Sequence, residues 1–286
     1  SKTILSGVRP YELVILKAMM RNEYLSFGDL KERFRTEYQC DFELSDMNNA
    51  IKVLQGHFVS KEEEYKKFCN IDILEYDEEK GINRIASFAN RLAYQEFYKQ
   101  VEDIVLVGLS RYEDKYAEGR KGVTPFVLYE KYSRRDVSLL MNCGKDLSST
   151  MYGMKRIEND VFIFVTYHKE QTDDDKNYVD GKPDYADVFD DNMIFRWDSQ
   201  IGKGKDSSYM LNVISAERKH LFVKKSDAES SFYYMGQFDI IDMKDAEKEN
   251  NKGKKETICK VRVKMQYPVR DDLLRYLQSN ITTDKI

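Results

Sequence analysis

One short run of residues, Phe195-Arg196-Trp197-Asp198-Ser199-Gln200, combines side chains that could read a nucleic-acid base. Trp197 offers a ring for stacking, Asp198 could accept a hydrogen bond from the amine of a cytosine, and Ser199 adds a hydroxyl. A core tryptophan with a polar flank is an alternative that fits the same residues. Further aromatic candidates for base recognition are Tyr152, Tyr167 and Tyr234.

Positive charge recurs along the segment Thr257–Tyr267. Apolar residues occupy every second position, and Lys260, Arg262 and Lys264 lie between them, which is the pattern of a two-faced strand. Steps of about 7 Å between such cations could follow a phosphate backbone. The alternative is an ordinary solvated sheet face. Other candidates for phosphate binding are Ser149, Thr150, Lys203, Lys205, Arg218 and Lys219.

Signatures of catalysis are missing from the sequence. The run Gly202-Lys203-Gly204-Lys205 lacks the spacing and the hydroxyl of a nucleotide-binding phosphate loop. None of the three histidines has a lysine two residues later, as a phospholipase-D-type nuclease requires. The four cysteines are far apart and form no zinc-binding pattern. We therefore expect no catalytic site, no metal and no cofactor in this chain.

The net charge of -4 hides an uneven distribution. Residues 170–191 hold nine acidic groups and two lysines, and the rest of residues 123–286 has 25 basic and 19 acidic groups. A basic surface is therefore compatible with an acidic total. Without an apolar run of about 18 residues or a signal-peptide pattern, we expect a cytoplasmic protein with no membrane partner. Because the chain begins at Ser1, we also expect a fragment of a longer protein.

Residues 1–122 are predicted to be mainly helical. The expected elements are helices after Pro10, over Phe27–Tyr38 with Ser26 as N-cap, and after Ser45, then a hairpin of Ile71–Tyr76 and Ile82–Ile85, and a helical stretch Phe88–Tyr116. Three short helices before a hairpin are the order of a winged helix. The third helix is not basic, so we assign it a structural or protein-contact role.

A change of pattern follows the predicted linker, residues 117–123. The expected strands are Phe126–Tyr129, Val161–Tyr167, Met193–Trp197, His220–Lys225, Phe232–Ile241 and Thr257–Tyr267; the expected helices are Arg134–Met141 and Asp271–Gln278; residues 170–191 and 245–255 are expected to be charged excursions. The prediction is an α+β protein: a helical, winged-helix-like coupling domain at 1–122, then a recognition domain with a mixed sheet or partial β-barrel at 123–286.

Several segments together resemble a known family. They are, in order, Tyr132–Val137, Ser148–Gly153, Ile163–Lys169, Phe195–Gln200, His220–Lys225 and Phe232–Gly236. The chain resembles, over roughly residues 20–245, the domain of uncharacterised function at the C-terminus of many bacterial DEAD/DEAH-type helicase proteins.

The nearest functional relatives implied by this resemblance are SauUSI-like type IV modification-dependent restriction endonucleases. The resemblance implies that the chain recognises 5-methylcytosine or 5-hydroxymethylcytosine in double-stranded DNA, as the C-terminal part of an ATP-dependent enzyme of host defence. Its other partners would be the nuclease and helicase domains of the parent chain. The alternative is a protein-interaction or coupling module of a helicase without base-specific DNA binding.

Overall fold

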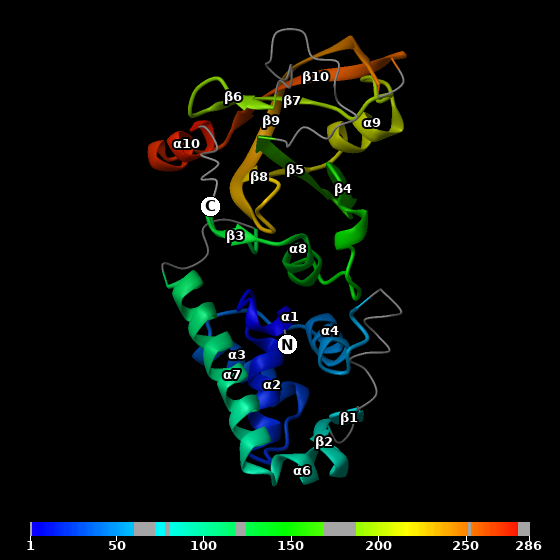
Figure 1. Ribbon diagram of the computed structural model, residues 1–286. Coiled ribbons are helices and arrows are strands. Elements are labelled where there is room, and N and C mark those ends of the chain that lie inside the picture. The colour runs from blue at the N-terminus through cyan, green and yellow to red at the C-terminus, as the bar shows by residue number, and fades with distance from the viewer. Residues whose placement is uncertain are drawn as a thin grey trace. The chain divides into compact units, whose positions relative to one another are not determined.

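The computed structural model describes residues 2–59, 72–77, 81–117, 124–168, 187–250 and 253–279 (Figure 1). The chain divides into two compact units: unit 1 is Ser1–Pro125 with Arg134–Ser149, and unit 2 is Phe126–Ser133 with Thr150–Ile286. The α+β class is confirmed. The functional division between residues 122 and 123 stays a prediction.

Unit 1 is mainly helical, as predicted. Its elements are α1 (Lys2–Leu5), α2 (Tyr11–Met20), α3 (Phe27–Glu37), α4 (Leu44–Leu54), β1 (Leu74–Asp77), β2 (Gly81–Arg84), α6 (Ala86–Leu92), α7 (Gln95–Tyr116) and α8 (Arg134–Leu140). Ser26 caps α3, because its hydroxyl accepts a hydrogen bond from the Asp29 amide at 3.1 Å. The third helix begins before Ser45, since Glu43 and Asp46 form its capping box. The winged-helix assignment stays a prediction.

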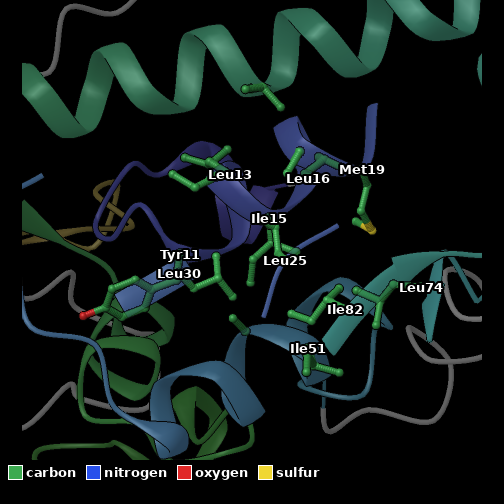
Figure 2. Packing of buried hydrophobic residues seen from close by; sticks show 14 of the residues in the cluster. Tyr11, Leu13, Ile15, Leu16, Met19, Leu25, Leu30, Ile51, Leu74 and Ile82 are labelled. Carbon is green, nitrogen blue, oxygen red and sulfur yellow. The ribbon is translucent and has the colours of Figure 1, made fainter. Parts of the chain in front are cut away.

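The core of unit 1 surrounds α2, which is buried on nearly all sides. Leu13 and Ile15 on α2 and Leu30 on α3 are fully buried, and Figure 2 shows Leu74 and Ile82 of the β1–β2 hairpin in the same cluster. A helix that is apolar all round must lie inside the protein rather than at its surface. α2 is therefore the element on which the rest of unit 1 packs.

Residues 134–149 belong to unit 1 although the residues on both sides of them belong to unit 2. The buried guanidinium of Arg9 donates to Glu12, to the carbonyl oxygen of Leu139 at 3.0 Å and to Asn142 Oδ1 at 2.8 Å. The Asn49 side-chain amide donates to the Asn142 carbonyl at 3.2 Å. These polar contacts hold residues 134–149, which we call the α8 segment, against α4 and the start of α2.

Unit 2 is built on a mixed sheet, which confirms that part of the prediction. The strands are β3 (Lys131–Tyr132), β4 (Met154–Ile157), β5 (Asp160–His168), β6 (Val188–Phe189), β7 (Ile194–Asp198), β8 (Arg218–Ser226), β9 (Phe232–Glu249) and β10 (Lys255–Met265), with helices α9 (Ser208–Ile214) and α10 (Asp271–Gln278). The 3-10 turn η1 (Ser148–Thr150) lies where the chain passes from unit 1 to unit 2. The strand order is β4-β5-β8-β9-β10-β7-β6, with β3 on β9. β5 and β8 are parallel and the other neighbours antiparallel. The partial barrel stays a prediction.

The two faces of this sheet are covered differently. On one, the helix-covered face, alternate residues such as Val161 and Val263 pack with Met210 of α9 and Leu273 of α10. On the other face, rings including Phe126 and Phe222 cover β5, β8 and the start of β9. The side chains of β7, β10 and the adjoining part of β9 on that side are mostly exposed, and we call this the open face.

Three expectations for residues 123–286 need correction or fall outside the structure. Phe126–Tyr129 is a turn, with Tyr129 at a φ of 67°, rather than a strand. β9 runs on to Glu249 and pairs with β10 as far as Lys255, so the charged excursion over 245–255 is mostly strand. Cross-strand pairing overrides the low strand propensity of such charged residues. Most of the acidic segment 170–191 lies outside the described residues.

Candidate nucleic-acid interface

The predicted cation row lies on the open face of unit 2. Arg262 and Lys264 are exposed and Lys260 is half-buried, while Val261 and Val263 between them are buried. Strand alternation explains this division, because successive side chains point to opposite faces. The apolar set packs under the helices, which leaves the three cations directed away from the core.

Two pairs of like charges lie directly opposite each other on this face. Lys260 is the register partner of Lys244 on β9, and Arg262 is the partner of Arg196 on β7. Like charges in this position destabilise a sheet. Acidic residues moderate the field: Asp242 and Asp239 face Arg262 and Lys264, and Asp190 accepts a 2.7 Å hydrogen bond from Arg196 Nε.

Within the parts of the chain that the structure describes, no salt bridge involves the β10 cations, which are Lys260, Arg262 and Lys264. Because Arg262 and Lys264 are also exposed, their positive charge is accessible to an anion from outside the protein.

The loop from Ser199 to Ser207 continues the edge of β7 along β10. The Ser199 amide donates to the Cys259 carbonyl at 2.9 Å, and the Cys259 amide donates to Ser199 Oγ at 2.8 Å. Lys203 forms a bridge with Ile258, and the Lys205 amide donates to Asp245 Oδ1 at 2.7 Å. The loop thus places Lys203 and Lys205 beside the Lys260 end of the cation row. Ser199 itself is buried and its hydroxyl holds the loop in place.

Tyr152 is the exposed aromatic residue next to this loop. Its side chain is 65% exposed, and its carbonyl accepts a 3.0 Å hydrogen bond from Gln200 Nε2. The following Gly153 has a φ of +73°, and a Cβ there would lie 3.0 Å from Gln200 Nε2 and 3.4 Å from the Tyr209 hydroxyl. Glycine is favoured by this conformation and by the close approach. Gln200 belongs to the run that the sequence singled out, although no role was predicted for it, and Tyr209 was not among the predicted site residues.

Trp197 and Asp198 are separated by the sheet. Trp197 is 5% exposed and lies on the helix-covered face, where its ring stacks on Tyr209 at a centroid distance of 6.3 Å. Asp198 points the other way and pairs in register with Lys260. The structure does not bring these two neighbours together around one base. Base recognition by Trp197 stays a prediction that would need the ring to become accessible.

The remaining aromatic candidates are also apart from Tyr152. Tyr234 is 2% exposed on the ring-covered part of the sheet, and Tyr167 is half-buried near the end of β5. The Tyr209 hydroxyl is buried and has no hydrogen-bond partner among the described residues. Burial raises the pKa of Tyr209, with a further contribution from Asp187. Its phenol therefore stays neutral.

The other predicted phosphate ligands are two cations that already have hydrogen-bond partners and two exposed hydroxyl residues. Arg218 makes two hydrogen bonds to Asp160, at 2.7 and 2.6 Å, and Lys219 Nζ donates to the Ala216 carbonyl at 2.7 Å. These contacts already engage both cations. Ser149 and Thr150 are exposed in η1. Phosphate binding by all four stays a prediction.

A buried polar network lies beneath Arg218. His220 Nε2 lies 2.7 Å from Asp160 Oδ1 and its Nδ1 3.0 Å from the Tyr234 hydroxyl, while the ring stacks on Phe162. Burial would raise the pKa of Asp160, but hydrogen bonds from His220 and Arg218 lower it to about 2. Burial lowers the pKa of His220, against the opposing effect of Asp160. His220 and Asp160 are at most 3% exposed, so the network stabilises the sheet rather than contacting a ligand.

Among the described residues, no group of three or more His, Cys, Asp and Glu side chains could hold a metal ion. Within the same residues, no helix has the length and apolar character needed to cross a membrane.

Comparisons with known proteins identify two sequence families. Residues 126–277 match Domain of unknown function (DUF3427), and residues 1–115 match Domain of unknown function (DUF8090). No curated protein is significantly similar to this chain in sequence.

Similar solved structures include SUVH6 of Arabidopsis thaliana in complex with SAM, which is 8% identical with a TM-score of 0.38. The similarity covers 99% of this chain and 43% of that one, so the chain spans less than half the length of SUVH6. ScoMcrA, a type IV phosphorothioation-dependent restriction endonuclease, is 9% identical with a TM-score of 0.33, covering 98% of this chain and 67% of ScoMcrA. Similarities this distant carry no argument about function. The DUF3427 match covers more than half of the sequence, and the chain belongs to that family.

Proposed function

We propose that this chain binds double-stranded DNA through unit 2 and recognises 5-methylcytosine or 5-hydroxymethylcytosine in it. In this proposal the chain is the non-catalytic C-terminal part of an ATP-dependent type IV restriction endonuclease. The observation that supports DNA binding is the set of opposed cations on the open face, Lys260 with Lys244 and Arg262 with Arg196. The modification and the parent enzyme rest on the family resemblance of the sequence alone.

Repulsion between the opposed cations favours an anionic ligand. Each like-charge pair costs folding free energy in the free protein, and a phosphate placed between the two cations removes that cost. Binding a polyanion also releases its condensed counterions, which is a favourable term for every phosphate contacted. Lys260, Arg262 and Lys264 recur at about 7 Å along β10, so the row can contact successive phosphates of one strand.

Base contacts would come from residues at the end of this row. Asp198 is the register partner of Lys260, and its carboxylate has the chemistry to accept a hydrogen bond from the N4 amine of cytosine. Both carboxylate oxygens are buried, so this contact would need the side chain to become accessible. Lys203 and Lys205 extend the positive surface past Asp198 along the edge of β10. Phosphate contacts of this kind position a protein on DNA, whereas base-edge contacts specify the sequence.

A salt titration tests DNA binding directly. The variant Lys260→Gln/Arg262→Gln/Lys264→Gln should lower the slope of log K against log salt by roughly 3, because about 0.9 counterions are released per phosphate contact. The matched control Arg35→Gln/Arg91→Gln/Lys99→Gln removes the same charge from exposed positions of unit 1 and should leave the slope nearly unchanged. Equal slopes for both variants would reject the open face as the DNA-binding surface.

The modification is tested separately with matched duplexes. Gel shifts with methylated, hydroxymethylated and unmodified DNA of one sequence should show tighter binding of a modified duplex at every salt concentration. If the three duplexes bind equally throughout the titration, recognition of modified cytosine is wrong, and DNA binding itself is still judged by the salt slopes.

A coupling role is the second candidate, favoured by a feature of unit 1. Leu106 and Val107 are adjacent on α7 and are 56% and 43% exposed, with the acidic Glu102 and Asp103 one turn before them. We take this exposed apolar pair as a candidate point of contact with a partner protein. The partners would be the nuclease and helicase domains of the parent chain. Tight binding of this chain to DNA at physiological salt would exclude coupling as its sole role.

A further inference from the structure

We infer that Tyr152 is the residue of this chain that stacks on the DNA bases, by partial insertion of its ring at a flexible pyrimidine–purine step of a duplex held by the unit 2 cations. The inference rests on the proposed DNA binding and adds to it a substrate preference. It selects one aromatic residue from the four that the sequence offered, and it identifies Gly153 and Gln200 as the residues that position it.

Exposure distinguishes Tyr152 from the other aromatic candidates. Its side chain is 65% exposed, whereas Trp197 is 5% and Tyr234 is 2% exposed. A ring can stack on a base only if one of its faces is accessible, because base and ring must approach to van der Waals distance. Stacking by the buried rings would require rearrangement of the core, whereas Tyr152 already lies at the surface.

Cations follow Tyr152 in the chain and lie on the loop that contacts its backbone. Lys155 follows three residues later in β4, and Gln200 joins the Tyr152 backbone to the loop that carries Lys203 and Lys205. No salt bridge within the described ranges involves any of these three lysines. An exposed ring among uncompensated cations is the combination that binds nucleic-acid bases and backbone together.

The backbone under Tyr152 is held rigidly. Its carbonyl accepts hydrogen bonds from the Met154 amide at 2.9 Å and from Gln200 Nε2 at 3.0 Å. The Gly153 carbonyl accepts from the Phe164 amide of β5 at 2.8 Å. In Figure 1, α9 lies beside β4, consistent with the hydrogen bonds from Arg156 Nη1 to the Asn212 carbonyl and Ser215 Oγ. Because the backbone at Tyr152 is already fixed, less entropy is lost when the ring is immobilised on DNA.

The preference for flexible steps follows from the cost of insertion. A ring that enters a base stack must unstack two neighbouring pairs, and pyrimidine–purine steps unstack most readily. Loss of one aromatic–base stack weakens binding by between about fivefold and a hundredfold. Tyr152→Ala should therefore bind on the order of tenfold more weakly to a duplex with a central TA step, and by a smaller factor to a matched stiff A-tract duplex.

The experiment uses the full chain and duplexes with 2-aminopurine at the central step. The wild-type protein should raise the fluorescence of 2-aminopurine, because unstacking relieves its quenching. Tyr152→Ala should abolish the rise and Tyr152→Trp should retain it, both with the wild-type salt slope. Tyr267→Ala is the matched control, since Tyr267 is 52% exposed on the same unit, and it should behave as wild type.

Further results distinguish failure of the inference about Tyr152 from failure of the proposed DNA binding. Gly153→Ala should reduce the fluorescence rise without changing the salt slope, because an added Cβ would approach Gln200 and Tyr209 and the required φ disfavours alanine. If Tyr152→Ala keeps the full rise and wild-type affinity while binding stays salt-dependent, the inference about Tyr152 is wrong and the proposed DNA binding stands. If neither wild-type nor variant protein binds DNA even at low salt, the proposed function fails.

Discussion

Trp197 and Asp198 illustrate how far a sequence motif can be interpreted residue by residue. Both have the right chemistry for a base, and they are neighbours in the chain. In the fold they point to opposite faces of β7, so Trp197 packs on Tyr209 in the core and Asp198 lies opposite Lys260 on the open face. The exposed ring is instead Tyr152, from a segment about 45 residues earlier in the chain.

The Asp160–His220 pair gives a prediction at the scale of single residues. The pKa of Asp160 falls from 3.8 to about 2 on folding, so its contribution of about 2 kcal/mol is complete above about pH 4 and is lost as the pH falls towards 2. Folding also lowers the pKa of His220. As the pH falls, the unfolded chain therefore protonates this histidine before the folded chain does, and the free energy of unfolding declines below about pH 6.5. The free energy of unfolding, measured in urea from about pH 8 to about pH 2, should show both declines.

Histidine variants provide the control for this pH dependence. His220→Gln should remove the decline that begins near pH 6.5, while His57→Gln, at an exposed histidine of unit 1, should retain it. An unchanged decline in His220→Gln would assign the effect to another group.

At the scale of elements, the α8 segment depends on one buried ion pair in unit 1. The side chains of Arg9 and Glu12 are 3% and 1% exposed, and Arg9 also holds Leu139 and Asn142. Removing one member of a buried pair leaves an uncompensated charge, at a cost of roughly 3–5 kcal/mol. Arg9→Met should lower the free energy of unfolding of unit 1 by that amount in a urea titration and should speed tryptic cleavage within residues 134–149.

The double variant Arg9→Met/Glu12→Leu is the matched comparison. It removes both charges together, so it should recover most of the lost free energy, because an apolar pair of similar volume replaces the ion pair. If the double variant were as unstable as Arg9→Met, the cost would come from lost contacts to residues 139–142 rather than from the buried charge.

At the scale of the whole molecule, the chain passes between the two units at three places, after Pro125, Ser133 and Ser149. The family match to residues 126–277 therefore includes a segment that folds with unit 1. In an excised fragment 126–277, residues 134–149 lose the partners Arg9, Asn49 and Phe58. Trypsin should cleave after Lys145 much faster in this fragment than in the full chain, as followed by mass spectrometry.

Cleavage after Lys264 provides the internal control for that measurement. This bond lies near the end of β10, a strand paired on both sides in the unit 2 sheet, and should resist trypsin equally in the fragment and in the full chain. Equal rates of cleavage after Lys145 in the two proteins would mean that the segment is ordered without unit 1.

Local patterns in the sequence were sufficient for most elements of this protein. Ser26 marked the start of α3, the apolar runs Ile71–Tyr76 and Ile82–Ile85 marked the β1–β2 hairpin, and the alternation around Lys260–Lys264 marked β10 and its cations. These features depend on contacts within a few residues, and capping, turn geometry and side-chain alternation act over that range. The identity of the cation row could therefore be predicted without a structure.

Contacts between distant segments determined the strand register, the surroundings of the candidate site and the division into units. The register of β10 with β9 and β7 placed Lys244 and Arg196 opposite its cations, and the contact of Gln200 with Tyr152 joined two segments 48 residues apart. Pairing also extended β9 through a charged segment expected to be a loop, and buried contacts assigned residues 134–149 to unit 1. Such contacts depend on where distant segments meet, and a one-residue change of register would reverse every face, so composition and spacing alone do not determine them.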